Sequence, residues 1–470
     1  MMKLVNYKIA CGVVATLAMC WSCGNAFLDV RPSVRQRVPH SFTDYMGLMD
    51  NITTMNNTSH ALGMMGNDEY YIIDAYYNIF PSYVQYQKRA YTWEREIYDG
   101  TELYMLDWNE GYKRILWSNL ALEGFEKIKV GDVSTEQLNM AKGTALFHRA
   151  WNYYNLAQLY CPVYDKSTAG GELGLPLRLE SDLTLRVPRA SLADTYRQIL
   201  ADLETAERLL PDYPEVVFRP GKGAVYGLLA RIALQMGAID EALNYANSGL
   251  TLHSALLDFN AVAFDQAPTF QPKGEGNPEV IFMAWLATLS NLDIIAYYRQ
   301  NPDTTLMDSY GEGDLRAKAF FREINNGMKH EYIGSYDGTS LSTYFTGIAT
   351  DELYLVRAEC AARLGDADKA LADLNLLRKH RFEAEMYEEL ASNDMAEVLG
   401  WVIAERRKEL VWRGTRWEDL RRLSKEPTYA TTLIRKVNGQ EFTLPPQSKR
   451  YVWPIPLDAV AAGGYVQNER

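Results

Sequence analysis

From about residue 105 onward, apolar residues recur at steps of three and four, which is the spacing of one face of an α-helix. One such face comprises Trp108, Tyr112, Ile115 and Leu116, together with the polar Asn119. The same spacing predicts long helices over residues 137–160 and 191–210. Ser191 is a suitable N-cap for the second of these, and Asp194 gives it an acidic first turn.

Two segments of this helical pattern repeat each other without gaps. The first is ARIALQMGAIDEALNYA and the second is AECAARLGDADKALADL. Small residues match in both, namely Ala230, Ala233, Gly237 and Ala242 in the first and Ala358, Ala361, Gly365 and Ala370 in the second. Alanine lets antiparallel helices approach closely, and glycine can adopt the left-handed conformation of the turn. The pattern is typical of tetratricopeptide repeats, and a weaker third copy is predicted around Ala150, Tyr153 and Ala157.

Other stretches lack a clean helical or strand period. Residues 42–65 predict a helix followed by a polar loop, and residues 66–100 are unusually aromatic and predict irregular structure. Residues 255–345 are rich in Asn, Asp, Gly, Pro and Tyr, with a strand-like run at Val280–Phe282. Helical-repeat proteins often bind their ligands through such insertions. We therefore predict a mostly α-helical fold, in which a tetratricopeptide-like scaffold carries a long irregular, aromatic-rich insertion.

The composition is that of a globular protein with a large core. The chain has 470 residues, of which 47% are hydrophobic and 23% charged. The formal net charge of -12 argues against a nucleic-acid partner, which would require a basic stripe. The same charge argues against docking on anionic lipid through a polybasic patch.

The N-terminus has the features of a lipoprotein signal peptide. An apolar run over residues 9–19 is too short to span a bilayer and follows a weakly positive segment. Ser22 precedes Cys23, which suits cleavage followed by acylation of the cysteine. We expect a signal peptide over residues 1–22 and a lipid anchor on Cys23, with Cys20 as the competing anchor.

The remaining cysteines and the histidines do not indicate a metal site. Cys161 and Cys360 lie in apolar helical contexts, which predicts buried thiols. The sequence leaves open whether these two cysteines form a disulfide. The six histidines are scattered without a ligand spacing, so we expect no zinc and no other metal. They are His40, His60, His148, His253, His330 and His380.

No catalytic motif emerges from the sequence. It has no phosphate loop, dinucleotide fingerprint or Gly-x-Ser-x-Gly elbow, and we expect neither a catalytic residue nor a cofactor. Glu405 and Glu409 share one helix face, as the carboxylates of a glycosidase could, but three basic residues lie between them. Carboxylates paired with arginine stay ionised. We therefore expect an ion-pair network that joins this helix to the turn at Trp417.

Several separated motifs are spread over essentially the whole chain. They are FLDV from Phe27 and Pro32, NPEVIF from Asn277, Asp308 with Asp314, Leu315 and Arg316, ELYLVRAE from Glu352, ERRKEL from Glu405 with Gly414, Arg416, Trp417, Asp419 and Leu420, and PIP from Pro454 with Asn468. In this order, the motifs resemble those of the SusD/RagB family of Bacteroidetes outer-membrane lipoproteins.

The resemblance implies a single SusD-like domain over residues 23–470. Its helical scaffold would cover about 105–255 and 345–425, with ligand-side insertions at about 60–100 and 255–345. It implies a non-enzymatic protein on the outer face of the outer membrane. Such a protein captures oligosaccharides or polysaccharide fragments and delivers them to a SusC-like TonB-dependent transporter barrel. Peptide capture by the same architecture, a tetratricopeptide adaptor that binds only protein, and a cryptic hydrolase are the alternatives.

The aromatic segments supply the candidate ligand contacts. Sugar rings can stack on Trp and Tyr while Asp, Asn and Arg bind hydroxyl groups. Asp68 also lies where the family tends to place a polar ligand contact. Each of the aromatic candidates could instead pack in a core. The candidates are Asp68, Tyr70, Tyr71, Trp93, Arg95, Trp285, Tyr297, Tyr298 and Arg299.

Overall fold

A computed structural model gives the fold of most of the chain. It describes residues 39–81, 84–102, 104–129, 131–274, 276–286, 294, 299–324, 329–338 and 343–470. The expected signal peptide, Cys20 and Cys23 therefore lie outside the described residues. The fold is mostly helical, as the sequence predicts, with 17 α-helices in the described part of the chain. No helix among these residues is long and apolar enough to cross a membrane.

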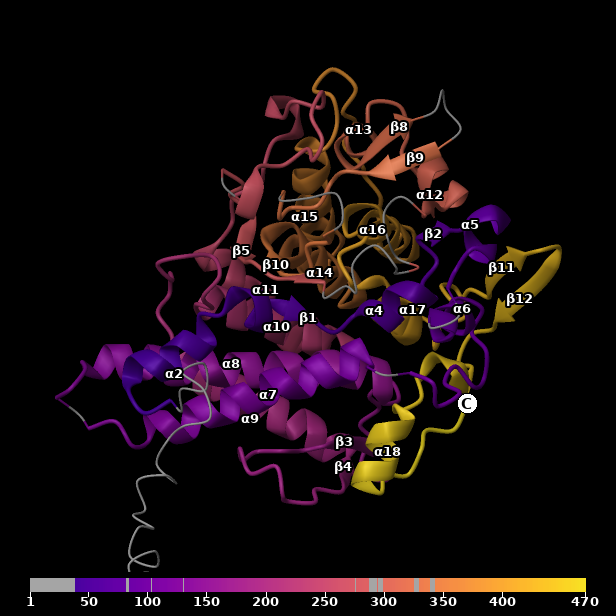
Figure 1. Ribbon diagram of the computed structural model, residues 1–470. Helices are drawn as coiled ribbons and strands as arrows, with labels where there is room; N and C mark the ends of the chain where they lie inside the picture. The colour runs from indigo at the N-terminus through magenta and orange to yellow at the C-terminus, as the bar shows by residue number, and fades with distance from the viewer. Residues whose placement is uncertain are drawn as a thin grey trace, which may run out of the picture.

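Three long helices lie side by side across the lower half of the molecule (Figure 1). They are α7 (Leu106–Phe125), α8 (Thr135–Tyr160) and α9 (Leu192–Leu209). The middle helix, α8, is buried along most of its length, because α7 and α9 both pack on it. Ser191 caps α9 as predicted, and its hydroxyl accepts a hydrogen bond from the amide of Asp194 at 3.0 Å.

Two helical hairpins confirm the predicted repeats. They are α10 (Lys222–Gln235) with α11 (Ile239–Leu252), and α14 (Thr350–Arg363) with α15 (Ala367–Lys379). Gly237 and Gly365 turn them at φ of 72° and 84°, a conformation that side chains with a Cβ rarely adopt. The alanines at the matched positions are buried, and α11 packs on α14, so that the two hairpins stack.

The C-terminal part returns to the scaffold and then leaves it. Helix α16 (Met395–Glu409) packs on α14, and α17 (Arg416–Leu423) follows after a short turn. Strands β11 (Leu433–Val437) and β12 (Gln440–Leu444) form an antiparallel hairpin at one side of the molecule, and α18 (Leu457–Gly463) lies below it (Figure 1).

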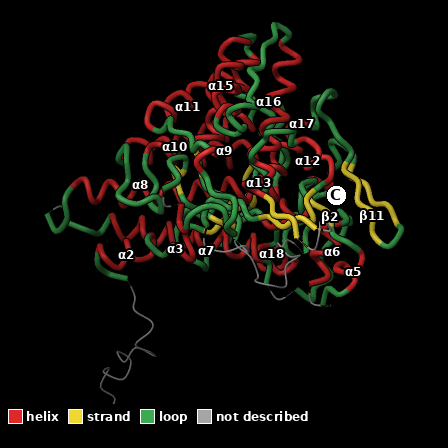
Figure 2. The backbone as a smooth tube through the Cα atoms, turned by 90° about the horizontal axis from the view of Figure 1, so that it is seen from above, coloured by secondary structure: helices red, strands yellow, loops and turns green. Residues whose placement is uncertain are grey.

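The segments without a clean period form short elements beside and between the helices of the scaffold (Figure 2). The helices are α2 (Phe42–Met49), α3 (Ile52–Met55), α4 (Ala61–Gly66), α5 (Asp74–Asn78), α6 (Gln85–Tyr91), α12 (Thr304–Ser309) and α13 (Arg316–Phe320). The strand pairs are β1 (Asn57–Thr58) with β6 (Trp285–Leu286), β2 (Tyr70–Tyr71) with β7 (Asn301–Pro302), β3 (Leu173–Pro176) with β4 (Arg189–Ser191), β5 (Val280–Phe282) with β10 (Ile348–Ala349), and β8 (Phe321–Ile324) with β9 (Lys329–Tyr332).

The predicted strand at Val280–Phe282 is confirmed as β5, and it ties the insertion to the scaffold. The Phe282 ring lies 5.0 Å from that of Phe147 and 5.5 Å from that of Trp151, both on α8. The helix expected at the start of residues 42–65 is α2, which ends at Met49. The segment expected to be a loop contains α3, β1 and most of α4.

The two cysteines of the helical region are buried, as predicted. Cys161 and Cys360 are both free thiols. Burial raises the pKa of the Cys161 thiol to about 11. Both therefore act as small apolar core residues at neutral pH.

Candidate ligand-binding site

A hollow of about 200 Å³ brings four of the sequence candidates together. We call it the Asp68 hollow. It lies between β2, the segment around Trp93 and strand β11. Its lining consists of Asn67, Asp68, Tyr70, Tyr71, Tyr91, Trp93, Asp303, Leu433, Ile434, Arg435 and Lys436.

Asp68 is fixed in this hollow by two arginines of the C-terminal signature. Its carboxylate accepts hydrogen bonds of 2.6 and 2.7 Å from Arg416, and Arg407 lies 3.5 Å away. Burial acts to raise the pKa of Asp68, but the two guanidinium groups outweigh it and hold this pKa well below its ordinary value. Asp68 is therefore an ionised acceptor with a fixed direction.

The neighbouring carboxyl group, Glu69, faces the protein interior. It accepts from the amide nitrogen of the Asn67 side chain at 2.6 Å and from the backbone of Trp412 at 3.0 Å. Burial raises the pKa of Glu69 to about 7. The backbone carbonyl of Glu69 accepts from Asp303 at 2.8 Å, which brings Asp303 to the edge of the hollow. Glu69 thus anchors the segment that carries Asp68.

Arg435 holds the inner wall of the hollow together. Its guanidinium group lies 3.7 Å from the ring centre of Tyr91 and 4.8 Å from that of Tyr70. It also donates to the backbone carbonyls of Tyr70, at 3.1 Å, and of Asn67. A cation between aromatic faces is favourable, and it keeps these rings in place. Arg435 therefore couples the β11–β12 hairpin to the segment that carries Asp68.

The aromatic candidates differ in how accessible they are. Tyr70 and Trp93 are 3% and 1% exposed, and the Trp93 indole donates to the carbonyl of Gly66 at 2.8 Å. Tyr71 is 42% exposed and stands at the rim together with Ile434, which is 57% exposed. Tyr71 is therefore the candidate ring of this hollow with the largest exposed face.

The other candidates lie outside the Asp68 hollow. Arg95 is exposed, and its carbonyl accepts from Arg470 at 3.2 Å. Trp285 is half-buried in β6, with its ring 6.1 Å from that of Phe218. Arg299 is buried, and its guanidinium group lies over the ring of Phe80 at 4.6 Å. Tyr297 and Tyr298 lie outside the described residues.

The sequence interpretation did not include the hairpin residues of this site. Ile434, Arg435 and Lys436 come from β11, and Asn438 and Gly439 form the turn at φ of 51° and 75°. Alternating apolar residues on both sides of an Asn-Gly pair are a strong hairpin signal. The hairpin could have been found from that signal, but its docking against residues 67–71 could not.

The C-terminal signature forms a buried ion-pair network, as predicted. Arg316 lies 2.6 Å from Glu405 and 2.9 Å from Glu409. Arg406 on α16 bonds Asp419 on α17 at 2.8 Å and so joins the two helices. The paired glutamates are structural, and the network positions Arg416 for Asp68.

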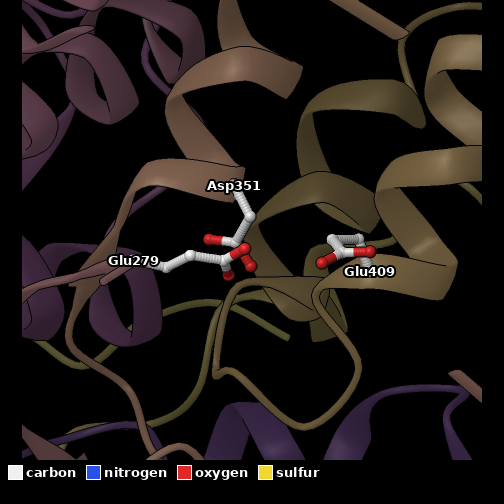
Figure 3. A group of neighbouring side chains, drawn as sticks. All are labelled: Glu279, Asp351 and Glu409. Atoms are coloured by element: carbon white, nitrogen blue, oxygen red, sulfur yellow. The ribbon is translucent and has the colours of Figure 1, made fainter. Parts of the chain in front are cut away.

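A second group of buried carboxylates comprises Glu279, Asp351 and Glu409, whose ligand atoms lie within 4.8 Å of one another. Figure 3 shows the Glu279 and Asp351 carboxylates turned toward each other, with Glu409 on a separate helix. Arg381 donates to Glu279 at 2.6 Å and to Glu409 at 2.8 Å. Arg413 donates to Asp351 at 3.0 Å. Guanidinium groups thus balance these charges, and the donor set fits an ion-pair network better than a cation site.

Two family models match the chain. One, described as "Starch-binding associating with outer membrane", covers residues 26–234. The other, described as "SusD family", covers residues 302–469. Residues 235–301, between the two matches, fall mostly in the irregular insertion at about 255–345. The proteins of this family are binding proteins and not enzymes.

Solved structures share the fold at low sequence identity. A SusD superfamily protein from Bacteroides thetaiotaomicron has a TM-score of 0.73 at 19% identity, over 92% of this chain and 100% of that one. A putative sugar binding protein from Bacteroides vulgatus has a TM-score of 0.71 at 20% identity, over 92% and 99%. A SusD-like carbohydrate binding protein from the same species has a TM-score of 0.68 at 19% identity, over 91% and 97%. No curated protein matches the sequence. The ordered motifs, the stacked helical hairpins and the two family matches agree, and the chain belongs to the SusD/RagB family.

Proposed function

We propose that this protein captures oligosaccharides or polysaccharide fragments at the Asp68 hollow and delivers them to a SusC-like TonB-dependent transporter. One observation carries the proposal: the exposed ring of Tyr71 stands beside the fixed carboxylate of Asp68. An aromatic face beside directed acceptors is what a sugar ring with its hydroxyl groups requires.

The chemistry of the hollow suits a neutral, hydroxyl-rich ligand. Arg416 and Arg407 already balance the charge of Asp68, and Arg407 also lies 3.0 Å from Asp303. The carboxylate oxygens have lone pairs beyond those that the arginines use, so that a sugar hydroxyl can still donate to Asp68. Tyr70 and Trp93 are buried in the wall of the hollow.

The relatives support the class of ligand and the location. Two of the similar structures carry sugar or carbohydrate binding in their names, and one matching family model names starch and the outer membrane. We propose that Cys23 carries the lipid anchor after removal of residues 1–22. Trp285, Arg95, Arg299, Tyr297 and Tyr298 stay predicted contacts for longer ligands.

Calorimetric titration of the mature protein with soluble polysaccharides and with mixed peptides tests this proposal. We expect binding of a polysaccharide, and a loss of about five- to thirtyfold in affinity when Tyr71→Ala removes a stacking ring worth about 1–2 kcal/mol. Tyr104→Ala is the matched control, because Tyr104 is 41% exposed and lies outside the hollow. Equal affinity of the two variants, or binding of peptides alone, would exclude the proposed glycan site.

The partner is tested separately. Purification of the protein from outer membranes should bring a TonB-dependent barrel with it, and Cys23→Ala should abolish acylation while leaving glycan affinity unchanged. A mature protein without an acyl group would overturn the anchor and leave the glycan site standing.

A further inference from the structure

A second and larger hollow lies at the C-terminal end of the molecule. It measures about 770 Å³, and we call it the C-terminal hollow. It shares no lining residue with the Asp68 hollow. Its walls come from the loop after α8, the end of α17, the loop after β12 and the C-terminal residues. This volume lies within the usual range of small-ligand pockets.

The walls of the C-terminal hollow are held by side chains that bond backbone groups. Gln467 accepts from the backbone of Ile455 and donates back to its carbonyl, both at 2.7 Å. Asn468 donates to the carbonyls of Tyr160 and Trp453 at 2.9 and 2.8 Å. Arg421 donates to the carbonyls of Gln158 and Cys161 at the end of α8. The hollow is therefore formed before any ligand arrives, which lowers the entropy lost on binding.

The charges around this hollow are balanced. Three carboxylates and three basic groups line it, and these are Asp165, Glu172, Glu469, Arg421, Lys425 and Lys449. Lys425 pairs with Asp165 at 3.3 Å, and Lys449 pairs with Glu469. Both pairs are largely exposed, and exposed ion pairs contribute little, so that they can open to bind hydroxyl groups. Such a lining favours a neutral ligand over an anion or a cation.

Two further features favour a ligand with hydroxyl groups and apolar faces. One carboxylate oxygen of Glu172 accepts from the Thr168 hydroxyl at 3.0 Å, whereas the other has no partner among the described residues. A carboxylate oxygen shielded from water in this way requires a donor, which a hydroxyl group supplies. Leu173 and Val466, which are 39% and 65% exposed, offer apolar surface for the C–H faces of a sugar.

Hydrogen bonds connect the segments that form the two hollows. The C-terminus lies below the β11–β12 hairpin in Figure 1, and the two overlap in the view from above in Figure 2. Arg450 donates to the carbonyl of Trp93 at 3.1 Å, and Arg470 donates to that of Glu94 at 2.9 Å. The segment from β11 to Val452 contributes to both hollows. One polymer can therefore reach both.

We propose that the C-terminal hollow is a second saccharide subsite, which binds another stretch of the polymer held at the Asp68 hollow. This inference rests on the proposed glycan function and adds a second contact to it. Two linked contacts on one chain raise the affinity for a polymer above that for a short fragment. The second hollow adds no affinity for a short fragment that fills only one hollow.

Substitutions at the C-terminal hollow separate the contributions of the two hollows to polymer binding. Val466→Trp places a large ring at the mouth of the C-terminal hollow, and Glu172→Gln removes the charge of the Glu172 carboxylate. The probes are six soluble polysaccharides: starch, dextran, inulin, arabinan, galactomannan and galactan. Affinity gel electrophoresis identifies the polymer that binds, and its short acid-hydrolysis fragments serve as the second probe in calorimetry. Val216→Trp is the matched control, since Val216 is 48% exposed and lies outside both hollows.

We expect Val466→Trp to weaken polymer binding by about tenfold, with a smaller loss for Glu172→Gln, whereas fragment affinity at the Asp68 hollow changes less than twofold. The melting temperature should not fall, because Val466 is exposed. Crystals soaked in the fragment should show sugar density in the C-terminal hollow. Unchanged polymer affinity in both variants, or ordered water only in the hollow, would overturn the second subsite alone. Failure of the wild-type protein to bind any of the six polymers would contradict the proposed function as well.

Discussion

The helical hairpins and the Asp68 hollow differ in the distance along the chain that their decisive contacts span. In the α14–α15 hairpin, the amide of Asp366 bonds the carbonyl of Ala361, five positions before it. In the Asp68 hollow, Arg416 and Asp68 are 348 positions apart, and Arg435 and Tyr70 are 365 apart. The scaffold is thus built from local contacts, whereas the hollow exists only when distant segments have docked. Substitution of a single docking residue should therefore destabilise the hollow more than substitution of a turn residue destabilises a hairpin.

The largest effect is expected from Arg435→Met. Methionine keeps much of the apolar stem but leaves the carbonyls of Asn67 and Tyr70 without a charged donor and removes the cation from its aromatic cage. We expect a loss of about 4 kcal/mol in the free energy of unfolding. Denaturant titration measures it. The next residue, Lys436, has a side chain that is 78% exposed, so Lys436→Met should change stability by less than about 0.5 kcal/mol. Equal losses would refute the docking role of Arg435.

A pH-dependent effect of intermediate size is expected at Glu418. Its carboxyl group accepts from the Tyr154 hydroxyl at 2.5 Å, across 264 positions, and burial raises its pKa from 4.5 to about 7. The folded state therefore holds this proton more tightly than the unfolded state. The contribution of Glu418 to the free energy of unfolding is fully present below about pH 4.5. This contribution falls as the pH rises through about 7 and stays low at higher pH.

Glu418→Gln should remove that loss, because the amide cannot ionise and still accepts from Tyr154. We expect the variant to gain about 3 kcal/mol in the free energy of unfolding relative to the wild type at pH 8 and to gain little at pH 4.5. Denaturant titrations at the two pH values measure the difference. The exposed Glu204→Gln is the control and should show no such dependence. A gain for Glu418→Gln that is equal at both pH values would contradict the assigned pKa.

The smallest effect is expected at the hairpin turn. Gly365 has φ of 84° and free space around its Cα, so Gly365→Ala meets only the strain of the left-handed backbone. That strain costs about 1 kcal/mol. Gly237→Ala, at φ of 72° in the other hairpin, should lose the same amount. Gly47→Ala, inside α2 and also with free space, should gain stability instead. Melting curves of the three variants decide whether the two hairpins are equivalent.

The same difference in range explains what could be predicted from the sequence. Ser191 as a cap, Gly237 and Gly365 as turns and the alanines at helix crossings act on neighbours a few positions away, so their spacing is visible in the chain. The pairing of Asp68 with Arg416 and the burial of Trp93 depend on the packed molecule. Tyr70 and Tyr71 are adjacent, yet one is 3% and the other 42% exposed, because the strand pair β2–β7 turns them to opposite faces.

Hydrogen–deuterium exchange of the mature protein, with and without a bound polysaccharide, tests most directly whether the Asp68 hollow is one ligand site made of distant segments. We expect residues 67–71 and 433–437 to become protected together when the ligand is added, while the turns at Gly237 and Gly365 exchange as before. Protection that is absent from both segments, or found in only one of them, would contradict the account.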